Sequence, residues 1–359
     1  MPPWCLRLLE WYYHARREMP WRGHPDAYAV WVSEIMLQQT QVNTVRPYFE
    51  RFLQLFPDVF ALASATDEAL LKAWEGLGYY TRVRNLRKAA QQLVAENKGR
   101  LPQTARELKN LPGIGAYTAA AIASICFNEC EPVVDGNVAR VFARRNLLSD
   151  DFSKEAPRRS LANWLRPFIS ACAAPGDFNQ AMMELGALIC IPRHPVCPQC
   201  PLRSECKAAE TMRQEDYPVA LKRKALPERK HEVLLLRNAK GELLLTQHQG
   251  ERLLDGFWEL PRRDLLSFPI RRLQKCYIHK QTFSHFRQIL TVFTAELPNE
   301  LPSLPPDFQW CAAPEKLPIT TATRKILMQM QSPHLQNHLT ERSSGSKTSR
   351  AAKKRKSAR

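Results

Sequence analysis

The hydrophobic positions of the chain change their spacing near residue 210. Through residues 1–210 they recur at helical intervals, whereas from residue 231 onward short apolar runs alternate with polar residues as in strands. In the first part, residues 104–111 are typical of a short helix with a polar face that stops at Pro112, and residues 116–127 form a dense apolar run. Residues 27–39 would form a helix with apolar side chains on nearly every face, which is typical of a buried helix. The pattern therefore predicts an all-α N-terminal part.

The C-terminal pattern predicts a separate α+β domain. Strands are expected at residues 231–237 and 242–248, joined at Lys240-Gly241, and again at residues 288–297. Residues 256–261 are expected to form an aromatic turn, and residues 320–330 a closing helix. A linker is expected at residues 211–230, with the basic run 222–224 inside it. The polar, Lys- and Ser-rich tail of residues 332–359 is expected to be disordered.

Between the two helical runs lies a glycine hairpin. Gly113 and Gly115 follow Pro112 with one residue between them, and both are expected to take backbone angles that other residues avoid. The hairpin amides and the N-terminus of the following helix together form a cradle suited to one phosphate. Turns of this composition are common, so the prediction depends on the helices on both sides.

Two acidic residues occupy unusual positions. Glu34 is the only charged residue between Asp26 and Arg46, within the run predicted to be buried. A lone buried carboxylate is costly unless it is paired or used, and burial would raise its pKa. A structural pair with Arg22 and a catalytic role are equally favoured on these grounds. Asp135 precedes a basic helical run, where it could cap that helix or serve as a catalytic carboxylate.

The composition favours a polyanionic partner. The chain carries a formal net charge of +17. Residues 341–359 hold eight basic residues against one acidic residue, which leaves +10 for the rest. We see no run of about 20 apolar residues and no secretory signal, so an intracellular protein without a membrane span is expected. Its ten cysteines are then not expected to form a disulfide framework.

Four cysteines are clustered. Cys190, Cys197, Cys200 and Cys206 fall within seventeen residues, a density that predicts a metal centre. Structural zinc sites usually present two close pairs, whereas only Cys197 and Cys200 are close here. The wide outer spacings are also compatible with a [4Fe–4S] cluster, so both metals remain candidates.

Together these segments resemble a known family. Residues 31–40 (WVSEIMLQQT), residues 111–119 (LPGIGAYTA) and the four-cysteine loop make residues 1–210 similar to the iron–sulfur branch of the helix-hairpin-helix DNA glycosylases, and within it to the MutY adenine DNA glycosylases. The resemblance implies a cluster domain of residues 1–25 with 132–210 and a six-helix domain of residues 26–131. Residues 231–331 resemble the Nudix-like domain with which the family recognises 8-oxoguanine. They lack the Nudix hydrolase box, so pyrophosphate hydrolysis is not expected.

The resemblance implies a hydrolase of base excision repair that removes adenine opposite 8-oxoguanine or guanine in double-stranded DNA. Related endonuclease III-type enzymes place a lysine after the hairpin, which forms an imine and leads to strand cleavage. This chain has Tyr117 there and no lysine from residue 110 to 153, which predicts a monofunctional glycosylase. A pyrimidine-damage glycosylase/lyase is the rival enzyme, disfavoured by Tyr117 and the extra domain. An iron–sulfur DNA-binding protein without activity is disfavoured by the two acids.

The resemblance also implies roles for individual residues. Glu34 would be the general acid and Asp135 the oxocarbenium stabiliser or nucleophile, with Tyr117 and Asn137 orienting Asp135 and the sugar. The remaining implied site residues are Arg22, Leu37 and Glu184 in the adenine pocket, Gln39 and Tyr79 as wedges at the lesion, Gly113 and Gly115 on a phosphate, Phe283, Ser284 and His285 on a turn that recognises 8-oxoguanine, and Cys190, Cys197, Cys200 and Cys206 on one structural [4Fe–4S] cluster. A monomer is expected, in the bacterial cytoplasm or nucleoid, or in the nucleus if the basic run 353–356 is a eukaryotic signal.

Overall fold

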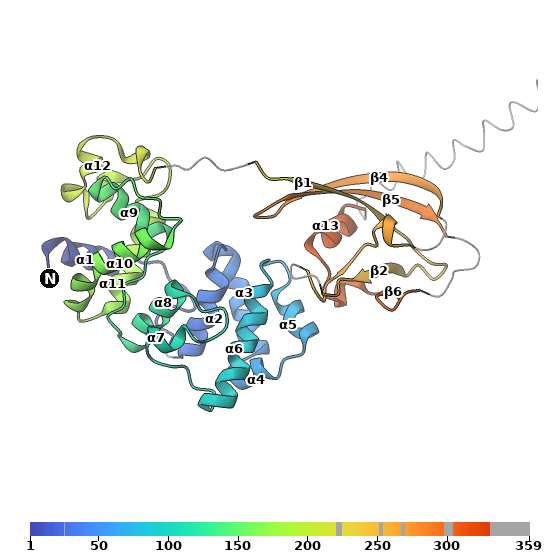
Figure 1. Ribbon diagram of the computed structural model, residues 1–359, viewed down its shortest axis with the longest axis horizontal. Coiled ribbons are helices and arrows are strands. Elements are labelled where there is room, and N and C mark those ends of the chain that lie inside the picture. Colours follow the sequence, from blue (N-terminus) through green and yellow to red (C-terminus); the bar gives the residue numbers. More distant parts are fainter. Residues whose placement is uncertain (25, 220–224, 251–253, 267–269, 298–303, 331–359) are drawn as a thin grey trace, which may run out of the picture. The chain divides into compact units, whose positions relative to one another are not determined.

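A computed structural model gives the fold of the chain (Figure 1). It describes residues 1–359 except 25, 220–224, 251–253, 267–269, 298–303 and 331–359. These residues fall into two compact units: those of residues 1–65 and 81–219, and those of residues 66–80 and 225–330. The predicted basic run 222–224 and the predicted tail 332–359 lie outside the described residues.

The first unit is helical, as the hydrophobic pattern predicts. Its α-helices are α1 (Pro3–Ala15), α2 (Ala27–Leu37), α3 (Val42–Leu55), α4 (Val59–Ala63), α6 (Thr81–Asn97), α7 (Ala105–Leu108), α8 (Ala116–Phe127), α9 (Gly136–Asn146), α10 (Glu155–Ser170), α11 (Pro175–Leu188) and α12 (Lys207–Glu210). Short 3₁₀ turns at Cys197–Gln199, Arg203–Glu205 and Gln214–Asp216 complete it. None of the described helices is long and apolar enough to cross a membrane.

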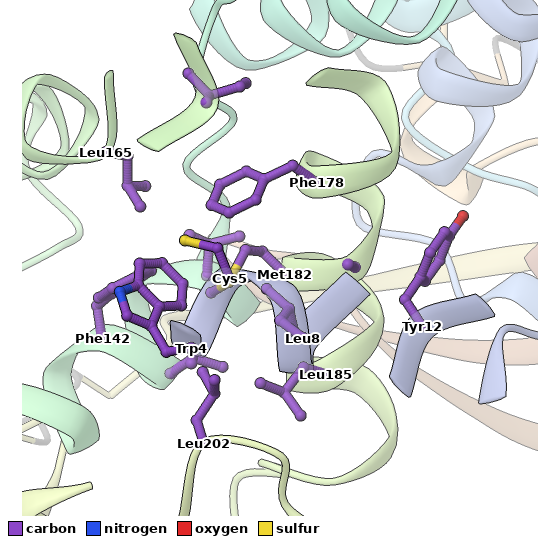
Figure 2. Close-up of a cluster of buried hydrophobic side chains, with 14 of the residues drawn as sticks. Trp4, Cys5, Leu8, Tyr12, Phe142, Leu165, Phe178, Met182, Leu185 and Leu202 are labelled. Carbon is purple, nitrogen blue, oxygen red and sulfur yellow. The ribbon is translucent and has the colours of Figure 1, made fainter. Parts of the chain in front are cut away.

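One hydrophobic core joins the start of the chain to residues far along it. Trp4, Cys5 and Leu8 of α1 pack with Phe142 of α9 and Phe178 of α11 (Figure 2). Leu165 of α10 and Leu202 of the cysteine loop belong to the same cluster. Burial of this many large apolar side chains is the main stabilising contribution of these helices. The core thus holds α9, α10 and α11 in fixed positions beside the cysteine loop.

Helix α2 is almost completely buried, and α8 packs against it. The N-terminus of α2 is capped by Asp26, whose carboxylate accepts a hydrogen bond from the Tyr28 amide. All of α2 except its first and last residues is buried, which confirms a buried helix, although it ends at Leu37 and Gln39 is exposed. Helix α8 starts at Ala116 and ends at Phe127, as its apolar run predicts, and contacts α2 along its buried face. Any ionisable side chain on α2 is therefore held away from water.

In its described residues the second unit contains two three-stranded sheets and two α-helices. The helices are α5 (Asp67–Trp74) and α13 (Thr321–Met330). One sheet has the order β1 (Glu228–Leu235), β5 (Arg287–Glu296), β4 (Arg271–Thr282), and the other β3 (Trp258–Glu259), β2 (Leu243–Gln247), β6 (Phe308–Cys311). Alternate side chains of β1 and β2 enter two separate apolar clusters, so both faces of these strands are buried. An α+β architecture is confirmed for this region.

The pairing of the first two strands differs from the simplest expectation of a hairpin. The turn at Lys240-Gly241 is present, with Gly241 at a φ of 81°. However, β1 pairs in parallel with β5 over eight residues, and β2 pairs with β3 and β6. Only an isolated bridge between Arg237 and Leu243 joins their ends. The other edge of β1 is met by residues 261–262, since the Leu234 amide donates to the Pro261 carbonyl oxygen at 2.9 Å and Val233 forms a bridge with Arg262.

Helix α5 packs with the second unit through ionic and backbone contacts. The Lys72 ammonium donates to the carbonyl oxygen of Leu317 at 2.9 Å and pairs with the Glu75 carboxylate at 2.8 Å. Arg324 of α13 pairs with the same carboxylate, which is buried. Residues 66–80 therefore belong with the C-terminal residues in the structure although they precede them by 150 residues.

Candidate active site

Asp135 caps the N-terminus of α9, as one of the two interpretations of the sequence proposed. Its Oδ1 accepts a hydrogen bond from the Val138 amide at 2.7 Å, and its Oδ2 accepts one from the Asn137 side-chain amide at 2.8 Å. Burial raises the pKa of Asp135 above its ordinary value, although these hydrogen bonds and the charge of Arg140 oppose the shift. The cap does not exclude a chemical role, because the carboxylate also faces a cavity.

Glu34 lies in the middle of α2 and is only 5% exposed. The Tyr117 hydroxyl donates a hydrogen bond to Glu34 Oε2 at 3.1 Å and lies 3.4 Å from the Met183 sulfur. Among the described residues, Tyr117 has no other side-chain hydrogen-bond acceptor. Burial raises the pKa of Glu34 to about 7; the Tyr117 hydrogen bond opposes this shift and the charge of Asp135 adds to it. Near neutral pH a large fraction of Glu34 therefore carries a proton.

The structural explanation for Glu34, an ion pair with Arg22, is wrong. Arg22 instead donates to Glu184 Oε2 at 3.1 Å. Arg17 binds the same carboxylate through its backbone amide at 2.9 Å and through two side-chain nitrogens at 2.9 and 3.0 Å. Burial would raise the pKa of Glu184, but the hydrogen bonds from Arg17 and Arg22 outweigh it and lower that pKa to about 2. No lysine, arginine or histidine in the described part of the chain forms a salt bridge with Glu34.

A cavity of about 460 Å³ brings these groups together. Ligand pockets typically measure about 300–1,000 Å³, so a nucleobase with its sugar is of suitable size. Seven of the predicted residues line it: Arg22, Glu34, Leu37, Tyr117, Asp135, Asn137 and Glu184. Residues that the sequence did not indicate also line it, among them Arg17, Trp21, Gln41, Asn43, Gln180 and Met183. One carboxyl with a pKa near neutrality and one hydrogen-bonded carboxylate in a single cavity can supply a proton and a negative charge to the same substrate.

Tyr117 lines the same cavity as Asp135 but forms its hydrogen bond elsewhere. Its hydroxyl contacts Glu34, and no hydrogen bond joins it to Asp135 among the described residues. Asn137 does contact Asp135, as predicted, and is itself held by Arg140, whose guanidinium donates to Asn137 Oδ1 at 2.8 Å. Arg140 also donates to the carbonyl oxygens of Gly186 and Cys190, both at 2.7 Å. Arg140 lies three residues after Asn137 on α9, and this helical spacing is the sequence feature that could have indicated their contact.

A close helix contact fixes Asn137. Gly186 of α11 lies against it, and a Cβ atom added at Gly186 would come within 2.5 Å of the Asn137 Cβ. A larger residue there would push α11 away from the start of α9. Gly186 thus allows Asp135, Asn137 and Glu184 to line one cavity.

The glycine hairpin lies in a second, open cavity of about 1,140 Å³, here called the groove. Gly113, Gly115 and Gln39 line the groove, which shares Leu37, Tyr117, Asp135 and Asn137 with the pocket. Gly113 has a φ of 80°, as predicted, and its added Cβ would lie 2.7 Å from the Asn85 Cβ. Gly115 has a φ of −88°, so the expectation that it needs a special backbone angle is wrong. It is the N-cap of α8, a position that Ser, Thr, Asn and Asp also favour.

The four clustered cysteines line one small cavity in the first unit. Arg144 lies beside them, 3.4 Å from the Cys190 sulfur, and donates to the carbonyl oxygens of Ile191 and Pro192. Within the described ranges no three Cys, His, Asp or Glu side chains are arranged to hold one metal ion. In a cubane each thiolate binds a different iron, so its ligands stand farther apart than those of a single zinc ion. Four thiols around one cavity, without a carboxylate, are the donor set that a [4Fe–4S] cluster takes.

The predicted recognition residues lie in the second unit. Phe283, Ser284 and His285 form the turn between β4 and β5, as predicted, and the turn is closed by a hydrogen bond from the Phe283 amide to the Phe286 carbonyl at 2.8 Å. The Ser284 hydroxyl is 3.2 Å from His285 Nδ1, and both side chains are exposed. Tyr79 belongs to the same unit; it has a φ of 50° and is 42% exposed.

Comparison with known proteins assigns the family. Residues 32–167 match the HhH-GPD superfamily of base excision DNA repair proteins. The human adenine DNA glycosylase is 34% identical over 89% of this chain and 72% of its own length. The chain belongs to the adenine DNA glycosylase family. An adenine DNA glycosylase from Buchnera aphidicola subsp. Schizaphis graminum is 32% identical over 78% of this chain and 83% of its own length.

A solved structure gives the same fold for the helical region. A trapped endonuclease III–DNA covalent intermediate superposes with a TM-score of 0.50 at 20% identity, covering 58% of this chain and 94% of its own. The helical region of this family member therefore has an endonuclease III-like fold. The family and the fold together establish a DNA glycosylase of base excision repair.

Proposed function

We propose that this chain removes adenine opposite 8-oxoguanine or guanine in duplex DNA by hydrolysing the N-glycosidic bond. The observation that carries the proposal is the pair of carboxyl groups in one cavity, with the pKa of Glu34 near 7 and both oxygens of Asp135 accepting hydrogen bonds. Adenine in a duplex is reached by flipping the nucleotide out of the stack. A cavity of about 460 Å³ that opens to the groove suits such a nucleotide.

Protonated Glu34 donates its proton to N7 of adenine. The bond between C1′ and N9 breaks as this proton is transferred, and its electron pair leaves with a neutral purine. General acid catalysis works best when the pKa of the acid is near the working pH, a condition that the burial of α2 provides. The Tyr117 hydroxyl holds the Glu34 carboxyl in position.

Asp135 stabilises the positive charge that develops on the sugar. It does so as an anion close to C1′, or by forming a bond to C1′ that water later breaks. Water supplies hydroxide to C1′ and its remaining proton passes to solvent. Asn137 and the Val138 amide fix the two carboxylate oxygens, so that no reorganisation is needed during the reaction.

The reaction stops at the abasic site. Strand cleavage by a lyase requires an amine that forms an imine with the sugar. No lysine lines the pocket in the described structure, and Tyr117 stands after the hairpin. A gel assay tests this on duplexes that hold A:8-oxoguanine, A:G or an oxidised pyrimidine. Strand breaks at adenine only after alkali treatment are expected; breaks without alkali, or at the pyrimidine alone, would overturn the proposal.

The turn at residues 283–285 reads 8-oxoguanine, and the second unit acts as a Nudix-like recognition domain. The lesion differs from guanine by an N7 hydrogen and an O8 oxygen, and exposed hydroxyl and imidazole groups can pair with these. Replacing both Ser284 and His285 with alanine is expected to reduce the preference for A:8-oxoguanine over A:G by about tenfold, the effect of one or two hydrogen bonds. Single-turnover rates on the two duplexes measure it.

Lys280→Ala provides the matched control for the turn, because Lys280 is exposed on β4 just before it. The control variant is expected to keep the wild-type preference. An unchanged preference in the double alanine variant would remove the turn from recognition.

A [4Fe–4S] cluster held by the four cysteines braces the loop that ends in α12. The purified protein is expected to contain about four iron atoms per chain and to absorb at roughly 400 nm. Replacing Cys200 with serine is expected to remove iron and to lower the melting temperature, whereas Cys276→Ser in the second unit should change neither. Elemental analysis that finds one zinc per chain would contradict the cluster.

A further inference from the structure

Helix α10 forms one wall of the groove, and none of its residues has a predicted role. The residues that it presents to the groove follow a helical spacing: Glu155, Arg158, Arg159, Ala162, Asn163 and Arg166. Leu161, Leu165 and Ile169 on its other face are buried in the core of the first unit. The core therefore fixes the polar stripe in place (α10 and α11 are labelled beside each other in Figure 1). The packed face thus holds the backbone of this stripe in position beside the groove.

The charges on this stripe are not equivalent. Arg166 is paired with Glu131 through two contacts of 2.7 and 3.1 Å, and Arg158 donates to the Phe152 carbonyl oxygen at 2.5 Å. The acidic residues that line the groove are Glu131, Asp135 and Glu155. Arg159 is exposed and, in the part of the chain that the structure describes, has no hydrogen bond or ion pair. Asn163, one turn further along the same stripe, is exposed too.

The glycine hairpin and Asp135 line the same groove as this stripe. A nucleotide whose sugar reaches Asp135 has one phosphate on its 5′ side and one on its 3′ side. The hairpin amides and the N-terminus of α8 suit one anion. A second cationic wall in the same groove suits the backbone on the other side of that nucleotide.

We propose that Arg159 and Asn163 of α10 bind the phosphodiester backbone of the duplex on the side of the flipped nucleotide opposite the hairpin. The inference rests on the proposed function, since it takes a nucleotide at Asp135 as given. Arg159 supplies the charge and Asn163 a neutral hydrogen-bond donor, a combination common in contacts to DNA phosphates. Such contacts fix the register of the strand and carry no base preference.

Salt dependence of duplex binding tests the inference. Each neutralised phosphate contributes about 0.9 to the slope of log affinity against log salt. Arg159→Gln is expected to reduce the slope by about 0.9, so that affinity falls about 3.5-fold less than in the wild type between 50 and 200 mM salt. Arg100→Gln is the control, because Arg100 is exposed but does not line the groove. An unchanged slope for Arg159→Gln, or an equal reduction for Arg100→Gln, would overturn the inference.

A neutral methylphosphonate placed at single positions of the adenine strand identifies the phosphate involved. Wild-type protein is expected to lose affinity at positions on both sides of the adenine, and Arg159→Gln to become insensitive on one side only. Sensitivity that stays the same on both sides in the variant would place Arg159 outside the contact. Adenine release by the wild type is measured in the same samples. Its absence would count against the proposed function, whereas normal release with an unchanged phosphate pattern would count against α10 alone.

Discussion

Replacing Glu34 with glutamine is expected to slow adenine release by about 10²–10⁴-fold, the usual contribution of a general acid. Glutamine has nearly the same shape and still accepts a hydrogen bond from Tyr117, but it has no acidic proton to give. Duplex binding should therefore change little. Single-turnover excision and equilibrium binding on the same A:8-oxoguanine duplex measure the two effects. Glu50→Gln, at an exposed position of α3, provides the control and should leave both unchanged.

Both the excision rate and the folding stability are expected to fall as pH rises. Because the pKa of Glu34 is raised to about 7, the protonated fraction and the excision rate are expected to fall as pH rises through 7. Folding stability follows the same direction. Below the ordinary value of 4.5 both states carry the proton, and between 4.5 and 7 only the folded state keeps it, so stability is lost as pH rises.

The glutamine variant has no ionisable group at position 34, so it does not lose this stability as pH rises. Near pH 8 it is expected to be more stable than the wild type by up to about 3 kcal/mol, and near pH 4 equally stable. Denaturant unfolding at the two pH values measures the difference. A Glu34→Gln variant with full activity, or with no gain in stability at pH 8, would contradict a buried protonated acid at this position.

Replacing Asp135 with asparagine is expected to reduce excision by about 10²–10³-fold, the scale of removing one preorganised electrostatic group. Asparagine caps helices as well as aspartate does, so the hydrogen bond from the Val138 amide and the start of α9 should persist. The expected loss is therefore one of charge and not of fold. Asp58→Asn tests this separation, because Asp58 caps α4 by the same geometry, accepting from the Ala61 amide at 2.8 Å.

The control variant at Asp58 is expected to keep wild-type excision. The Asp135 variant should unfold at a temperature close to that of the wild type while its excision rate falls. Wild-type excision by Asp135→Asn would show that the carboxylate only caps the helix. A large loss of stability would attribute the effect to folding instead.

The sequence predicted those parts of the molecule that depend on local pattern. The apolar runs gave α2 and α8 close to their observed ends, and isolation among apolar residues marked Glu34. The position of Asp135 before a helix predicted its cap. These features depend on neighbouring residues along the chain, which periodicity and capping preferences describe well.

Contacts between residues far apart in the chain could not be predicted from the sequence. Arg17 is 167 residues from Glu184, and no local signal marks it as the partner of that carboxylate. Tyr117 reaches Glu34 and not Asp135 because α2 and α8 pack directly together. The parallel pairing of β1 with β5 likewise depends on a partner that lies about 60 residues further along the chain. Tertiary packing decides each of these cases.

The identity of the released base tests the central claim most directly. A duplex with adenine opposite 8-oxoguanine is incubated with excess protein, and the products are separated and analysed by mass spectrometry, with and without borohydride. Free adenine and an abasic strand in equal amounts are predicted, with no protein–DNA adduct trapped by borohydride. A trapped imine adduct, or intact adenine strand although the duplex is bound, would contradict a monofunctional adenine glycosylase that uses Glu34 and Asp135.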